Sequence, residues 1–221
     1  MYVLLERLLN HVLPHILSYA YAPIFRFLTG HNLLKLGQQV HAHMALCEVE
    51  PDAFLAAKMV AMYASSGNLK LAMAVFHMIS GPSALLYNSI LWACAWYGYF
   101  EITIGIFFRT HSLGVKGDNF TFPFVLKSCA KLSSCWMGKC VHGWSLRIVL
   151  EFDMYVGTSL IDMHVKCGEF ADARKSFDKM TVRDISSWNA LIAGYTREGK
   201  IQVAEDLFRE CHVEILFLGL L

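Results

Sequence analysis

Charge and proline are both scarce in this sequence. Charged residues make up 17% of the 221 residues, proline occurs five times, and the formal net charge is +1. So little charge beside so much apolar content excludes intrinsic disorder, and the low proline and glycine content excludes collagen-like or proline-rich low-complexity material. Because basic and acidic residues balance, composition predicts no bulk electrostatic attraction to nucleic acid. Any such binding must come from locally placed side chains.

Metal-binding cysteine motifs are also missing. The seven cysteines are odd in number and show no C-x-x-C spacing, which argues against a zinc ribbon or a disulfide framework. We expect small buried residues in a reducing compartment. His41 and His43 lie two residues apart and would not share a helix face, so His41 and the similar His142 are interpreted as packing residues. We predict neither a metal nor another cofactor.

One long apolar run raises the question of a membrane. Residues 90–108 could span a bilayer with Glu101 as their only acidic charge. The alternative is a pair of short buried helices broken near Gly98. Residues 191–209 occupy the same place in the repeat described next and are rich in charge. Buried helix faces therefore explain the run better than lipid, and we predict no membrane partner.

An internal repeat organises the chain. At an offset of 101 residues, nine identities align without a gap, among them Gly67 with Gly168 and Phe76 with Phe177. Gly67 and Gly98 are 31 residues apart, as are Gly168 and Gly199, while Gly98 and Gly168 are 70 apart. The interval of 70 corresponds to two units of 35, with Ser133 in place of the glycine between them, so the period consists of units of 35, 35 and 31 residues. Each unit predicts helix, turn, helix, with a small residue and then an aromatic one turn later. The predicted fold class is all-α, an α-solenoid of stacked antiparallel helix-turn-helix repeats.

The motifs that carry a family resemblance are MYASSGNLKLAMAVF, YNSILWACAWYG, SLIDMHVKCGEFADARKSFDKM and RDISSWNALIAGYTREGKIQVAEDLF. They resemble the plant pentatricopeptide repeat proteins, in the branch that alternates standard, long and short repeats. In that frame residues 1–17 form an apolar N-terminal segment, residues 18–209 the solenoid and residues 210–221 a diverged tail. The repeats fall at 18–52, 53–83, 84–118, 119–153, 154–184 and from 185 onward.

The resemblance implies single-stranded RNA binding at one base per repeat. In the family, the fifth and last residues of a repeat read the base together. Asn88 with Asp118 implies uracil over cytosine, and Thr158 with Asp184 implies guanine. Asn189 is in place, but its partner position is Gly219. Outside the repeat frame, the same residues would be interpreted as helix N-terminal caps or as parts of a solvated turn.

Other repeats depart from this pattern. Pro123 with Asp153, and Ala57 with Ser83, give little side-chain readout of a base. In the family the second residue of a repeat packs on a base face, so the resemblance implies stacking at this position, and Ser186 is the weakest of these residues. The stronger stacking candidates are Phe54, Leu85, Phe120 and Tyr155.

Catalysis is not expected in this chain. His212-Val213-Glu214 matches the first half of a zinc deaminase signature, but no C-x-x-C follows. The resemblance implies a recognition module for organellar RNA processing or C-to-U editing, in a mitochondrion or chloroplast. Chemistry would come from a separate deaminase or accessory protein. The alternatives are a helical-repeat protein scaffold and a truncated, non-functional product. The apolar N-terminus has only weak transit-peptide character, and a helical cap fits it equally well.

Overall fold

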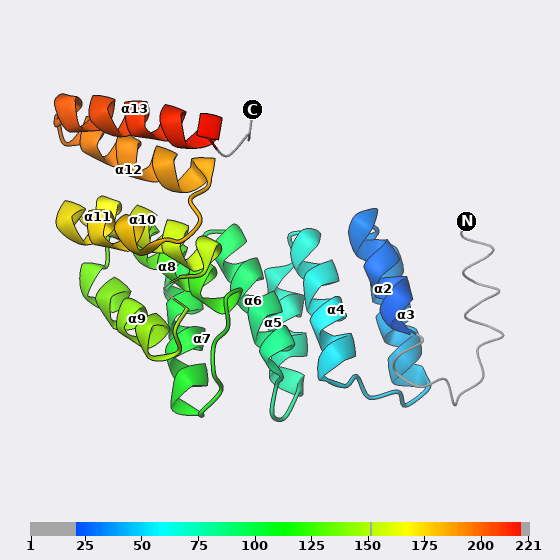
Figure 1. Cartoon of the computed structure of the whole chain (residues 1–221). Coiled ribbons are helices and arrows are strands. Elements are labelled where there is room, and N and C mark those ends of the chain that lie inside the picture. The colour runs from blue at the N-terminus through cyan, green and yellow to red at the C-terminus, as the bar shows by residue number, and fades with distance from the viewer. Residues whose placement is uncertain (1–20, 151, 218–221) are drawn as a thin grey trace. The chain divides into compact units, whose positions relative to one another are not determined.

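Antiparallel helix pairs follow one another along the chain (Figure 1). The computed structural model describes residues 21–150 and 152–217, and every regular element among them is a helix. The chain divides into two units, Met1–Gly98 and Tyr99–Leu221. The first unit contains α2 (Tyr21–Gly30), α3 (Leu34–Leu46), α4 (Ala53–Ser65), α5 (Leu69–Met78) and α6 (Ala84–Trp96). The second contains α7 (Phe100–Ser112), α8 (Thr121–Lys131), α9 (Cys135–Arg147), α10 (Met154–Lys166), α11 (Phe170–Lys179), α12 (Ile185–Arg197) and α13 (Ile201–Phe217).

The two layers of each unit follow from the order of the pairs. In the first unit α2 contacts α4 and α4 contacts α6, and in the second α8 contacts α10 and α10 contacts α12. The first helices of successive pairs therefore form one continuous layer within each unit. The second helices pack on the first helix of their own pair and on that of the next. The fold is an all-α solenoid, as the sequence predicts.

The turn inside a pair needs a left-handed residue. Gly67, Gly98, Gly168 and Gly199 have φ between 75° and 83°, a conformation that costs glycine nothing. Ser133 has φ 50° at the position where the repeat predicts a glycine. The same turn geometry is thus kept where the sequence departs from the pattern.

The recurrent aromatic of α5, α7 and α11 packs against the next pair. Phe177 meets the buried Trp188 edge to face with ring centroids 4.5 Å apart. Equivalent contacts join Phe76 to Tyr87 at 5.4 Å and Phe107 to Phe122 at 5.7 Å. These rings fill the space between neighbouring pairs, as predicted.

The small residue one turn earlier permits close approach of helices. A Cβ added to Gly138 on α9 would lie 2.4 Å from Sδ of Met163 on α10, and one added to Gly37 on α3 would lie 2.5 Å from Cε of Met62 on α4. These glycines therefore allow the second helix of one pair, α3 or α9, to approach the first helix of the next pair, α4 or α10.

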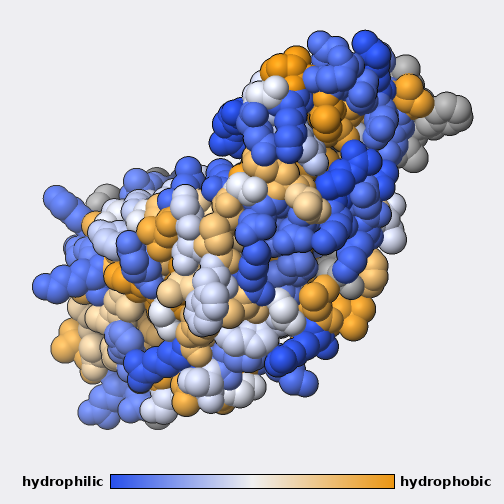
Figure 2. Space-filling model, turned by 90° about the vertical axis from the view of Figure 1, so that its left-hand side faces the viewer, coloured by the Kyte–Doolittle hydropathy of each residue, from blue (hydrophilic) through white to orange (hydrophobic). Residues whose placement is uncertain are grey.

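The apolar run over residues 90–108 is divided between two helices. Both α6 and α7 have 13 residues, and Gly98 with φ 83° lies between them. Among the described residues, no helix combines the length and apolarity that a membrane crossing requires. The face shown in Figure 2 carries separate apolar residues (orange) set among polar ones (blue).

Two predicted segments extend outside the described residues. The apolar segment 1–17 lies wholly outside them, and the tail 210–221 lies outside them from residue 218 onward. Residues 210–217, which we expected to diverge, continue α13 as regular helix. The repeat boundaries stay a prediction.

Candidate nucleic-acid interface

Short polar side chains cap the first helices at equivalent positions. Asp52 accepts from Leu55 N at 2.7 Å, Asp184 from Ser187 N at 2.8 Å, and Asp153 from Tyr155 N at 3.0 Å. Asp118 accepts from Phe120 N at 2.9 Å. Each acid is the last residue of a predicted repeat, so the helix-cap interpretation and the base-reading interpretation apply to the same residues. The caps fix these carboxylates in place.

Large apolar side chains lie exposed two positions after Asp52, Ser83, Asp118 and Asp153, whereas Ser186 stands at this position after Asp184. Phe120 is 62% exposed, Tyr155 61%, Phe54 48% and Leu85 44%. Single exposed apolar side chains are ordinary on a protein surface, but these four recur at one register of the repeat. Lys58 Nζ lies 5.2 Å from the Phe54 ring centroid. The exposed rings of Phe54, Phe120 and Tyr155 suit stacking on bases, and Leu85 offers an apolar contact at the same register.

One predicted base-reading pair is in direct contact. Thr158 on α10 donates from Oγ1 to Oδ1 of Asp184, which caps α12, over 3.3 Å. Both residues are half-buried. The carboxylate therefore orients the threonine hydroxyl.

The other predicted readout residues are placed separately. Asn88 lies half-buried on α6 in the first unit, and Asp118 precedes α8 in the second, so their pairing stays a prediction. Asn189 is exposed on α12, and its partner position Gly219 lies outside the described residues. Pro123 is half-buried on α8 and Ala57 is buried on α4.

A row of cations at the ends of the first helices was missed by the sequence analysis. Lys131, Lys166 and Arg197 end α8, α10 and α12 and line a hollow of about 450 Å³. Lys166 also forms an ion pair with Asp162 at 2.6 Å. Each cation follows the stacking position of its helix by 11 residues, which returns to nearly the same helix face about 16 Å further along. The repeated interval of 11 was the signal that could have revealed them.

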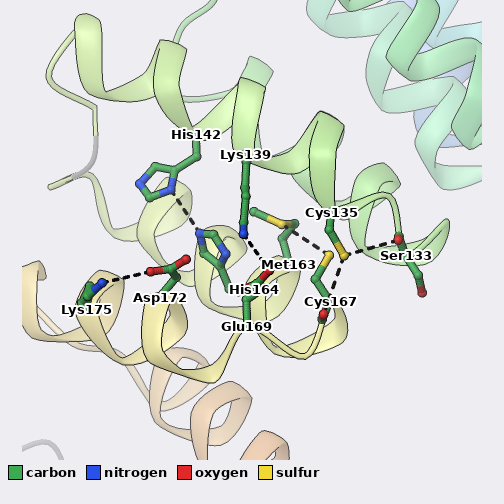
Figure 3. Close-up of polar contacts among 10 residues, drawn as sticks. All are labelled: Ser133, Cys135, Lys139, His142, Met163, His164, Cys167, Glu169, Asp172 and Lys175. Carbon is green, nitrogen blue, oxygen red and sulfur yellow. Dashed lines mark hydrogen bonds and ion pairs between the residues drawn. The ribbon is translucent and has the colours of Figure 1, made fainter.

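The histidines connect neighbouring pairs, as predicted. His41 Nδ1 lies 2.8 Å from the Tyr63 hydroxyl on α4, and His142 Nδ1 lies 3.1 Å from His164 Nε2 on α10. Figure 3 shows the second contact beside the ion pair of Lys139 with Glu169. Burial, and then the neighbouring His142, lowers the pKa of His164 to about 4. The side chain is therefore neutral near pH 7.

The remaining candidate groups lie in packing environments. Glu214 of the partial deaminase signature forms an ion pair with Arg183 at 3.1 Å. Cys94, Cys129 and Cys211 are buried, as expected, whereas the other four cysteines are half-buried. Burial raises the pKa of Cys94 to about 11 and that of Cys129 to about 12. These two thiols are protonated at neutral pH.

Solved structures with the same fold include the maize pentatricopeptide repeat protein PPR10. Its crystal structure matches with a TM-score of 0.75 at 22% identity, over 88% of this chain and 28% of that protein. Its complex with an 18-nucleotide psaJ RNA element matches with a TM-score of 0.74 at 21% identity, over 88% of this chain and 29% of that protein.

Sequence relatives point the same way. The family model described as "PPR repeat" matches residues 158–185 and 186–214. Pentatricopeptide repeat-containing protein At5g56310 of Arabidopsis thaliana is 35% identical over 179 residues, which cover 80% of this chain and 34% of that protein. The chloroplastic protein At4g25270 of the same plant is 35% identical over 78% of this chain and 33% of its own length. The chain thus spans about a third of these relatives. It belongs to the pentatricopeptide repeat proteins.

Proposed function

We propose that this chain binds single-stranded RNA along its first helices, one base for each helix pair. The contact between Thr158 and Asp184 carries the proposal. It joins the two residues that the repeat frame assigns to one base, beside the exposed Tyr155 ring. Support also comes from the maize relative, whose structure was solved with an RNA element.

The guanine preference follows from the Thr158–Asp184 geometry. A carboxylate only accepts hydrogen bonds, and guanine is the base that offers adjacent N1–H and N2–H donors on its Watson–Crick edge. Oδ1 of Asp184 is held by Ser187 N and the Thr158 hydroxyl. This fixed carboxylate can therefore accept from guanine without reorganising. Adenine presents an acceptor at N1, which an anionic oxygen repels.

Phosphates would follow the cation row. Lys131, Lys166 and Arg197 lie along the same three first helices as Phe120, Tyr155 and Ser186. Each neutralised phosphate of a single strand contributes about −0.7 to the slope of log K against log salt. Three contacts would give a slope of about −2. That modest electrostatic term fits the net charge of +1.

The biological role that we propose is sequence recognition in organellar RNA processing, including C-to-U editing sites. In this role the chain binds RNA and a separate deaminase or accessory protein performs the chemistry. Relatives named as chloroplastic support an organellar location, in a chloroplast or a mitochondrion. We also propose that the chain belongs to the branch with alternating standard, long and short repeats, which the repeat spacing of 35, 35 and 31 residues supports.

A binding titration tests the RNA proposal. Short RNAs that carry uracil, any base and then guanine would be titrated against the chain at fixed salt, with each of the four bases placed in turn at the guanine position. We expect guanine to bind about fivefold to tenfold more tightly than the other bases, the worth of one or two net hydrogen bonds. Equal affinity for all four, or none, would reject base readout and favour a protein scaffold.

A further inference from the structure

In the long repeat, 119–153, the first residue carries the side-chain amide that the fifth residue lacks. Pro123 carries no side-chain donor or acceptor. The structure nevertheless places a donor on the carboxylate at the end of the same repeat. Asn119 Nδ2 donates to Oδ2 of Asp153 over 3.3 Å. Asn119 is four residues before Pro123 and lies in the turn that precedes α8.

This contact resembles the Thr158–Asp184 contact in its length and its acceptor, although Asn119 donates to Oδ2 and Thr158 to Oδ1 of the acid. In both cases a side chain at or just before the first turns of one first helix donates to the acid that caps the next first helix, over 3.3 Å: Asn119 lies two residues before α8, and Thr158 lies on α10. In both cases Oδ1 of the acid accepts from a helix N–H, namely Val156 N at 3.1 Å for Asp153. Asn119 and Asp153 are both half-buried, and the exposed Phe120 and Tyr155 lie one and two residues after them.

We propose that Asn119 replaces Pro123 in base readout, so that the Asn119–Asp153 pair selects uracil between Phe120 and Tyr155. The inference rests on the proposed RNA binding. The sequence alone predicts little base preference for the long repeat, whereas the Asn119–Asp153 pair would give it a preference for uracil. The three bases read by the repeats at 84–118, 119–153 and 154–184 would then be uracil, uracil and guanine.

The choice of uracil follows from the orientation of the amide. Because a carboxylate only accepts, Asp153 must face Nδ2 of Asn119, and this contact uses one of the two N–H groups. The second N–H and the Oδ1 carbonyl remain as a neighbouring donor and acceptor. Uracil offers the complement, a carbonyl oxygen beside N3–H. Cytosine presents N3 as an acceptor, which would oppose Oδ1, and the amide cannot flip without losing Asp153.

The test is a titration of four RNAs that differ only at the middle base, against the wild-type chain and Asn119→Ala. We expect wild type to bind middle uracil roughly fivefold to tenfold more tightly than cytosine, and Asn119→Ala to reduce that ratio below about twofold. Discrimination at the guanine position should stay unchanged in the variant. Circular dichroism establishes that the variant is folded.

A second variant tests whether an amide at the fifth position restores the uracil preference that Asn119→Ala removes. In the double variant Asn119→Ala/Pro123→Asn, the amide moves to the fifth position, and uracil preference should return. A wild-type chain that selects guanine but ignores the middle base would overturn this inference and leave RNA binding intact. Retention of the uracil preference in Asn119→Ala would overturn the inference as well. Absence of discrimination at every base would reject the proposed function together with the inference.

Discussion

The recurrent aromatic residue of the second helices is buried in one pair and exposed in another, so the same Phe→Ala substitution can be compared at the two sites. Phe177 and Phe208 occupy the same place on α11 and α13, but Phe177 is 1% exposed and Phe208 is 64% exposed. Phe177 packs on Trp188 at 4.5 Å, and the Arg183 guanidinium carbon lies 4.7 Å from its ring centroid. Truncation at Phe177 therefore opens a cavity between two helix pairs and removes an aromatic contact.

The difference in burial sets the size of the effect. A buried Phe→Ala change costs about 3–5 kcal/mol in lost transfer energy and cavity. At a mostly exposed site the same change is expected to cost about 0.5 kcal/mol or less. Phe177→Ala should thus lower the free energy of unfolding by roughly 2.5 kcal/mol or more beyond the loss for Phe208→Ala.

Urea denaturation followed by helical circular dichroism measures both variants. We expect a large shift of the midpoint for Phe177→Ala and almost none for Phe208→Ala. Equal losses at the two sites would refute the claim that this aromatic binds each pair to the next. Loss of helix content in Phe208→Ala alone would refute it as well.

The packing, the histidine pair and the stacking row each give a further prediction. Gly194→Ala places a Cβ 2.6 Å from Val165 Cγ1 and should cost about 1–3 kcal/mol, whereas Gly143→Ala, with nothing within 4 Å, should gain about 0.5–1 kcal/mol in thermal or urea melts; a stabilised Gly194→Ala would contradict the close approach of α10 and α12. The pKa of His164 is lowered to about 4 from 6.5, so the unfolded chain binds more protons between these values, and stability should fall by up to about 3 kcal/mol as pH drops from 6.5 to 4. His164→Tyr, which copies Tyr63 at the equivalent position, should flatten the stability profile over this window, and an unchanged slope would show that other groups cause it. Tyr155→Ala should weaken RNA binding about fivefold or more, on a stacking worth of about 1–3 kcal/mol, while Phe152→Ala, 47% exposed outside the stacking register, should leave affinity within about twofold; similar losses would indicate a non-specific apolar contact.

The sequence was sufficient for the repeat but only partly for the interface. The small residue, the aromatic residue one turn later and the turn residue, including Ser133, recur at fixed positions of the repeat. The helix pairs, and the packing of the aromatic against the next pair, could therefore be predicted, but not that Trp188 is the partner of Phe177. The Thr158–Asp184 contact followed from the frame alone. The Asn119–Asp153 contact could not, because it depends on how the segment before α8 approaches the cap of α10. The partners of Gly37 and Gly138 on the next pair likewise depend on packing between pairs.

The central claim of the proposed function is that Thr158 and Asp184 together read one base. The most direct test is a substitution that should change the base they prefer. Titration of Thr158→Asn against RNAs with guanine or uracil at that base, at fixed salt, should show the preference move from guanine to uracil because an amide then faces the carboxylate. Discrimination at the neighbouring bases should be unchanged. A guanine preference that survives in Thr158→Asn, or a uniform loss of affinity without any change of preference, would contradict base readout by this pair.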